Sequence, residues 1–182
     1  MGLVPVTNKT DYLQANAMGA PLRLIPHSDG MFGLQFKLFG LFTIGLGDLD
    51  RVGIKKEMIA GREVLKARLD GQELLIGERI KPGTLPDIWK KRTGSYEIVN
   101  AGDDHVLVKD ISLREEEGLL VVEYSIPSLF KGRMKFALNP ISDTEAVLYG
   151  LGRGMGETLS VVRIGNEEQP RYSGYVLKAI AK

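Results

Sequence analysis

The pattern that most directly suggests covalent chemistry is Ser128-Leu-Phe-Lys131. In enzymes with an S-x-x-K motif, the serine begins a helix and the lysine one turn later activates it. Here Pro127 precedes the serine, and Val121–Ile126 and Arg133–Leu138 on either side alternate like strands, so the two side chains would not share a helical face. The companion motifs S-D-N and K-T-G are absent from the sequence. We therefore interpret the pattern as a chance match and predict no catalytic residue.

The two histidines both neighbour carboxylates, in His27-Ser-Asp29 and in Asp103-Asp104-His105. If the two segments met, they could bind a metal ion or form a general-base pair. Both segments are turn-like, however, and Asp and Ser favour turns because their side chains bond to nearby backbone. We predict turn residues here, with no metal and no cofactor. The alternative is a small hydrolase with a site near His27 or His105.

Four glycines alternate with larger residues between Gly150 and Glu157. The spacing does not fit the phosphate-binding G-x-G-x-x-G motif, and no helical pattern follows it. Read as a strand, the segment has one face made only of glycine. Such a face is typical of tight barrel curvature or of a groove shaped for a ligand. We favour curvature; under the ligand hypothesis the binding residues are Tyr149, Gly152, Arg153 and Glu157.

The amino-acid composition excludes several classes of function and does not favour some kinds of binding partner. The 182 residues carry 24 Lys and Arg against 23 Asp and Glu, a net charge of +1, which does not favour nucleic acid as a partner. The absence of cysteine excludes disulfides, thiol catalysis and Cys-ligated metals. A hydrophobic share of 43% and a charged share of 26% are those of an ordinary folded, water-soluble domain.

The elements that must position these residues are mostly strands. Residues 32–38 and 133–138 alternate with the period of two that a half-buried strand requires. Asp70-Gly71 lies between two strand-like runs and predicts a two-residue hairpin turn. Only Thr10–Met18 has helical spacing, and Pro86–Gly94 predicts one short helical turn.

These elements predict an all-β protein, an antiparallel meander closed into a lipocalin-like β-barrel with a short N-terminal helix. Closure is favoured because it hides the strand edges, and a sandwich is the alternative. Lys81–Leu85 divides the strands into two groups, each too short for a large domain, so we expect them to share one core. The expected organisation is a helix or linker over residues 1–20 and a single barrel over 21–182.

The sequence also gives expectations about where in the cell the protein is located. Met1–Pro26 has no basic segment followed by an apolar one, so no signal peptide is predicted and a cytoplasmic location is the default. The most apolar stretch, Met31–Gly47, is shorter than a membrane-spanning helix and includes Lys37, so no membrane span is predicted.

A set of short motifs resembles the C-terminal region of serine beta-lactamase-like hydrolases, in which a penicillin-binding-protein-type catalytic domain is followed by a lipocalin-like β-barrel. The resemblance covers most of the chain from about Leu22. Its motifs are His27-Ser-Asp-Gly30 with Phe32-Gly33, Gly61-Arg-Glu63, Gly77-Glu78, Trp89 with Gly94 and Tyr96, Gly150-Leu-Gly-Arg153 with Gly156-Glu157, and Tyr172-Ser-Gly-Tyr175.

The resemblance implies a non-catalytic module, because the catalytic motifs of those hydrolases belong to the domain that precedes the barrel. The module would be accessory to a beta-lactamase-like catalytic domain or would bind a small apolar ligand, and it could form oligomers. Ser128 and Lys131 do not lie where the nucleophile of the family would be.

Overall fold

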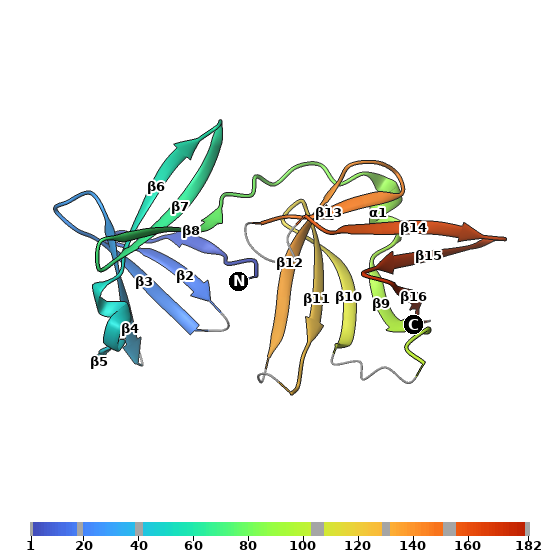
Figure 1. Cartoon of the computed structure of the whole chain (residues 1–182), viewed down its shortest axis with the longest axis horizontal. Coiled ribbons are helices and arrows are strands. Elements are labelled where there is room, and N and C mark those ends of the chain that lie inside the picture. Colours follow the sequence, from blue (N-terminus) through green and yellow to red (C-terminus); the bar gives the residue numbers. More distant parts are fainter. Residues whose placement is uncertain are drawn as a thin grey trace. The chain divides into compact units, whose positions relative to one another are not determined.

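The structure is a computed structural model that describes residues 2–17, 20–38, 42–102, 108–128, 132–150 and 156–180. The described chain is all-β, as predicted, and α1 (Asp87–Lys91) is its single α-helix (Figure 1). The chain divides into two compact units. The N-terminal unit is Val4–Arg79, and the barrel unit comprises residues 80–180 together with Gly2 and Leu3. Within the described residues, no helix is both long enough and apolar enough to cross a membrane.

The N-terminal unit is a single open antiparallel sheet in the order β1-β2-β3-β4-β6-β7-β8, with β5 paired to β4. Its strands are β1 (Val6–Asn8), β2 (Leu13–Ala17), β3 (Ala20–Pro26), β4 (Phe32–Leu38), β5 (Phe42–Ile44), β6 (Gly53–Ile59), β7 (Arg62–Leu69) and β8 (Gln72–Glu78). A 3-10 helix (Gly47–Arg51) precedes β6. The predicted hairpin is confirmed: Asp70 and Gly71 connect β7 to β8 with φ of 50° and 80°, as a type I′ turn requires.

The helix predicted over Thr10–Met18 is wrong, because this segment contains strand β2. β2 pairs with β1 on one side and β3 on the other, and Ala15 is buried in the core of the unit with Leu13 packed beside it. Nine residues are too few for a helix that is stable by itself in water. Pairing on both edges therefore outweighs the local helical spacing.

The outer face of β6, β7 and β8 carries a network of charges. The Lys55 Nζ lies 2.7 Å from a Glu73 oxygen, and the Lys66 Nζ lies 3.3 Å from Glu73 and 2.9 Å from Glu57. The hydrogen bond from Lys55 is the largest influence that lowers the pKa of Glu73. Each of the three strands contributes to the network, so it links them by their side chains as well as by their backbones.

We expect Glu73→Gln to lower the urea midpoint of the N-terminal unit at low ionic strength, with the difference shrinking as salt is added. Exposed ion pairs contribute little each and are screened by salt, so this effect should be the smallest described here. Urea titrations at two salt concentrations test it, with Asp11→Asn as an exposed control in the same unit. Identical midpoints for Glu73→Gln and wild type at low salt would contradict a stabilising network.

The barrel unit is a closed antiparallel barrel of eight strands in the order β9 to β16, with β16 paired back to β9. The strands are β9 (Gly94–Ile98), β10 (Lys109–Glu116), β11 (Leu119–Ser125), β12 (Arg133–Pro140), β13 (Glu145–Leu148), β14 (Thr158–Ile164), β15 (Glu167–Tyr172) and β16 (Tyr175–Ala179). The predicted strands on either side of Ser128 and the short helix before Gly94 are both confirmed.

The strands of the two units do not share one core, contrary to our expectation. Leu24, Val52 and Ile54 belong to the core of the N-terminal unit, whereas thirteen buried residues form the core of the barrel. Residues 80–86 connect the units and include two prolines, which cannot donate to a strand ladder. Both edges of β9 are taken by β10 and β16, so β8 cannot pair with it. The barrel therefore closes on strands after residue 80 alone.

One end of the barrel is closed by α1. The Trp89 side chain is 0% exposed, and its indole N–H donates to the Ser142 carbonyl at 2.8 Å. The Arg92 guanidinium lies 4.7 Å from the centre of the indole and forms an ion pair with Glu168. Leu113 is among the fully buried core side chains. This end is a packed plug and not an open lumen.

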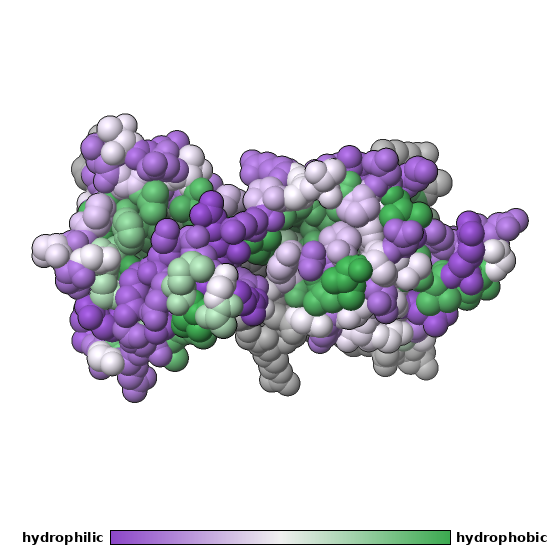
Figure 2. Space-filling model, turned by 90° about the horizontal axis from the view of Figure 1, so that it is seen from above, coloured by the Kyte–Doolittle hydropathy of each residue, from purple (hydrophilic) through white to green (hydrophobic). Residues whose placement is uncertain are grey.

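The end opposite α1 is less tightly packed. The apolar side chains there pack against the core but are only partly buried; they are Ile98, Val108, Val122, Tyr124, Met134 and Tyr172. Large apolar side chains also reach the surface of each unit (Figure 2), including Leu74, 62% exposed, and Ile180, 50% exposed. The side chains in the barrel interior are thus fully buried near α1 and only partly buried at the opposite end.

Candidate functional site

Most of the glycine-rich segment, residues 151–155, lies outside the described residues, so its interpretation as a strand stays a prediction. β13 ends at Leu148 and β14 begins at Thr158, and the described residues between them are not strand. The Gly156 N–H donates to the Leu148 carbonyl at 2.9 Å, and the Leu148 N–H donates to the Glu157 carbonyl at 2.9 Å, which extends the pairing of β13 with β14. Gly156 has a φ of +82°, which favours glycine. Gly152 and Arg153, two of the predicted ligand residues, lie outside the described residues.

The other two predicted ligand residues lie on opposite sides of this connection. Tyr149 follows β13, and its N–H donates to the Ala137 carbonyl of β12 at 2.9 Å. Glu157 immediately precedes β14 and interacts with Tyr172: burial, then a hydrogen bond to Glu157, raises the pKa of the Tyr172 phenol. Burial and the Glu157 charge also raise the pKa of Tyr124, whose ring stacks on Phe136 with centroids 5.7 Å apart. Glu157 therefore interacts with an aromatic cluster that contains Tyr124, Phe136 and Tyr172.

The first histidine segment is a hairpin turn between β3 and β4. The His27 N–H donates to the Met31 carbonyl at 2.8 Å, and Asp29 accepts the Met31 N–H at 3.1 Å. This backbone hydrogen bond, followed by the charge of Arg68, lowers the pKa of Asp29. The prediction of turn-forming polar residues is confirmed for this segment. Asp103, Asp104 and His105 lie outside the described residues.

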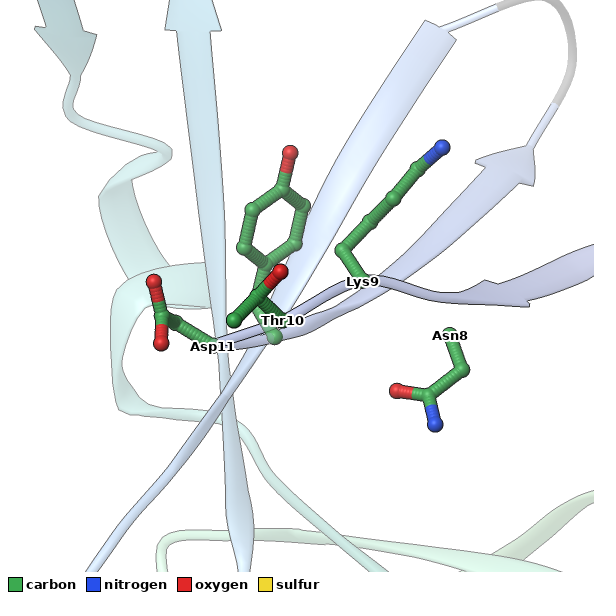
Figure 3. A pocket seen from close by; sticks show the side chains of 5 residues that line it. Asn8, Lys9, Thr10 and Asp11 are labelled. Atoms are coloured by element: carbon green, nitrogen blue, oxygen red, sulfur yellow. The ribbon is translucent and has the colours of Figure 1, made fainter.

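The remaining sequence candidates do not converge on a site. Ser128 lies in the turn after β11, and Lys131 lies outside the described residues. Within the described part of the chain, no three His, Asp or Glu side chains are grouped closely enough to hold a metal ion. A shallow depression at the hairpin between β1 and β2 is lined only by residues 8–12 (Figure 3). Its labelled side chains point in different directions, so we do not regard it as a built site.

A second depression is a groove in the barrel wall between β9 and β10, and side chains from several strands line it. These two strands pair through only three residue pairs, from Tyr96↔Ile111 to Gly94↔Leu113, and β10 has a bulge between Lys109 and Ser112. The strands are unpaired beyond Tyr96 and Ile111, and the groove there has a volume of about 540 Å³. Its lining is Ser95, Tyr96, Glu97, Ile98, Ala101, Val108, Lys109, Asp110, Ile111, Ser112, Arg114, Arg133 and Ile180.

On the polar side of the groove, two arginines that line it form ion pairs with Glu123, which lies on the outer face of β11. The Glu123 side chain is 9% exposed, and its two oxygens lie 3.1 Å from the Arg133 Nε and 3.3 Å from the Arg114 Nε. The Arg133 guanidinium also donates to the Ser112 hydroxyl at 3.2 Å and to the Asp110 carbonyl at 2.6 Å. One nearly buried carboxylate thus fixes two guanidinium groups on neighbouring strands.

Asp110 shapes the bulge that opens the groove. Its φ of 54° is unusual for a residue other than glycine, and it places the side chain within 2.6 Å of the Ser125 hydroxyl, which donates to it. The Ser125 hydroxyl also lies 3.2 Å from the Lys109 carbonyl. The local backbone strain, of order 1–3 kcal/mol for such a conformation, is offset by these side-chain hydrogen bonds.

Sequence reasoning missed this groove because its charged residues look like an ordinary solvent-facing strand pattern. Arg114, Glu123 and Arg133 each occupy the polar positions of an alternating strand. The sequence does contain one indication of the groove: the middle of three consecutive strands carries a negative charge, and the strands on either side of it carry positive ones. The pairing register that brings the charges together, and the bulge at Asp110, are not visible in the sequence.

Comparison with known proteins finds no family model that matches the chain, no similar curated protein and no similar solved structure. No match therefore links the chain to the beta-lactamase-like hydrolases, and that resemblance stays a prediction.

Proposed function

We propose that the chain is a non-catalytic, lipocalin-like barrel module that binds a small, mostly apolar ligand in the groove between β9 and β10. The observation that carries this proposal is the groove itself. Its volume of about 540 Å³ lies within the range of small-molecule sites, and it combines apolar and polar lining residues as such sites do.

The apolar part of the lining supports a ligand with a hydrocarbon body. Ile98 and Val108 are partly buried members of the accessible end of the barrel core, and Ile180 is half exposed beside them. Burial of exposed apolar surface contributes roughly 25 cal/mol per Å². Eight-stranded barrels have room for side chains or for one small ligand. Because Trp89 seals the α1 end, the ligand in this proposal lies in the wall groove and not in a deep lumen.

A role beside a beta-lactamase-like catalytic domain stays a prediction that would be compatible with such a module. The alternative of a small hydrolase also stays a prediction. His27, the one histidine within the described residues, belongs to the N-terminal unit and not to the barrel that carries the groove.

Ser95→Trp should weaken binding of a small apolar probe about tenfold or more, because it places a large ring in the groove. Ser95 is exposed on β9, and an aromatic side chain suits a strand, so we expect the variant to fold. Calorimetric titration of the full chain with 1-octanol measures the change. Thr158→Trp, an exposed position on β14 outside the groove, is the matched control.

Two results would overturn the proposal. One is the absence of saturable octanol binding to the wild type at concentrations below the solubility of octanol. The other is equal affinity in wild type, Ser95→Trp and Thr158→Trp, which would place the binding site elsewhere.

A further inference from the structure

The polar side of the groove contains two arginines whose orientation is already fixed. Glu123 forms ion pairs with the Nε of both Arg114 and Arg133, and the Arg114 Nε also donates a 3.4 Å hydrogen bond to the Ser112 hydroxyl. The closest approach of Arg114 to Glu123 and its hydrogen bond to Ser112 are both made through the Nε, and the Arg114 side chain is 55% exposed. This exposure leaves the outer part of the guanidinium accessible to a ligand.

The other charges around the groove do not occupy this position. The lining carries Lys109, Arg114 and Arg133 against Glu97 and Asp110. Asp110 is engaged by the Ser125 hydroxyl at 2.6 Å. Glu123 lies behind the two arginines and balances part of their charge. The attraction for an anion therefore comes from the guanidinium groups of Arg114 and Arg133, which line the same groove, and not from a large net charge.

We propose that the ligand is an amphipathic carboxylate, whose carboxylate group is bound by Arg114 and Arg133 and whose apolar chain lies along Ile98, Val108 and Ile180. This inference rests on the proposed function and specifies its ligand. A guanidinium presents parallel N–H donors that match the two oxygens of a carboxylate, and such charge-assisted bonds are roughly twice as strong as neutral ones. Apolar side chains and arginines line one groove, which an amphipathic molecule can contact with both its parts.

The test compares three probes with the same chain and different heads: octanoate, 1-octanol and octylammonium. Each is titrated calorimetrically into the full chain at neutral pH. We expect octanoate to bind about tenfold more tightly than octanol, and octylammonium to bind more weakly than octanol. Arg114→Gln should remove the advantage of octanoate and leave the affinity for octanol unchanged.

Arg114 is the better position for this substitution because its side chain is 55% exposed and Arg133 still pairs with Glu123 in the variant. Arg171→Gln, an exposed arginine on β15 that does not line the groove, is the matched control. The urea midpoint of each variant shows whether the barrel is intact. Arg114→Lys keeps the charge but not the planar donors, so it should recover only part of the advantage.

The outcomes separate the inference from the function on which it rests. Octanol bound as tightly as octanoate, or octylammonium bound most tightly, would overturn the carboxylate inference and leave an apolar ligand site standing. An advantage for octanoate that persists in Arg114→Gln would also overturn the inference. No binding of any probe would overturn both proposals.

Discussion

Trp89→Ala should destabilise the barrel unit by about 3–5 kcal/mol, the usual cost of deleting a buried aromatic side chain. Trp89 is fully buried where α1 closes the barrel, so its removal leaves a cavity that the strands cannot fill without moving. It also leaves the Ser142 carbonyl without its donor and removes the ring on which Arg92 packs. A loss of this size is a large fraction of the roughly 5–15 kcal/mol that stabilises a typical domain.

The measurement must distinguish the two units. Amide signals of β10 and β11 report on the barrel, and those of β6 and β7 on the N-terminal unit, so a urea series followed by NMR gives a midpoint for each. Trp89→Phe, which keeps most of the apolar volume but not the indole N–H, should lose clearly less than Trp89→Ala. A Trp89→Ala barrel as stable as wild type would show that α1 does not seal the barrel.

Glu168→Gln should cost the barrel about 3 kcal/mol, because it leaves Arg92 buried without its counter-charge. Arg92 is 6% exposed and forms two bonds with Glu168, Nε to Oε2 at 2.8 Å and a terminal nitrogen to Oε1 at 2.9 Å. The cost is placed at the lower end of the range for a broken buried pair because the Glu168 side chain is 38% exposed and therefore partly screened. Glu167→Gln, the exposed neighbour on β15, should have almost no effect.

The same pair predicts how barrel stability depends on pH. The hydrogen bonds from Arg92 lower the pKa of Glu168 below its ordinary value of 4.5. A carboxylate with a lowered folded pKa contributes its full stability above the unfolded pKa and loses it as the pH falls through the folded one. Between pH 7 and pH 3 the wild-type barrel should therefore lose more stability than Glu168→Gln. Parallel pH profiles of the two proteins would contradict this assignment.

Much of the fold can be predicted from local sequence features. Every second residue of the segment 133–138, namely Met134, Phe136 and Leu138, packs in the barrel core as predicted, because side chains alternate between the two faces of a strand. The Asp70-Gly71 turn and the short helix at Trp89 were also correctly predicted, since both depend on nearby residues.

Features that depend on pairing between distant segments could not be predicted in this way. The segment Thr10–Met18 has helical spacing but becomes a strand because β1 and β3 pair with it. The separation into two units depends on β16 closing onto β9, and no local residue encodes that contact. The groove likewise depends on where the pairing of β9 and β10 stops, which follows from the bulge at Asp110.

The claim that the groove between β9 and β10 is a ligand site can be tested most directly by locating bound octanol. An NMR titration of the full chain with 1-octanol should give saturable amide shifts concentrated around Tyr96, Ile98, Ile111 and Ile180, which line the groove. Amides of β6 and β7 in the N-terminal unit should not move. Shifts that do not saturate, or that concentrate in the N-terminal unit and leave the groove unchanged, would contradict the claim.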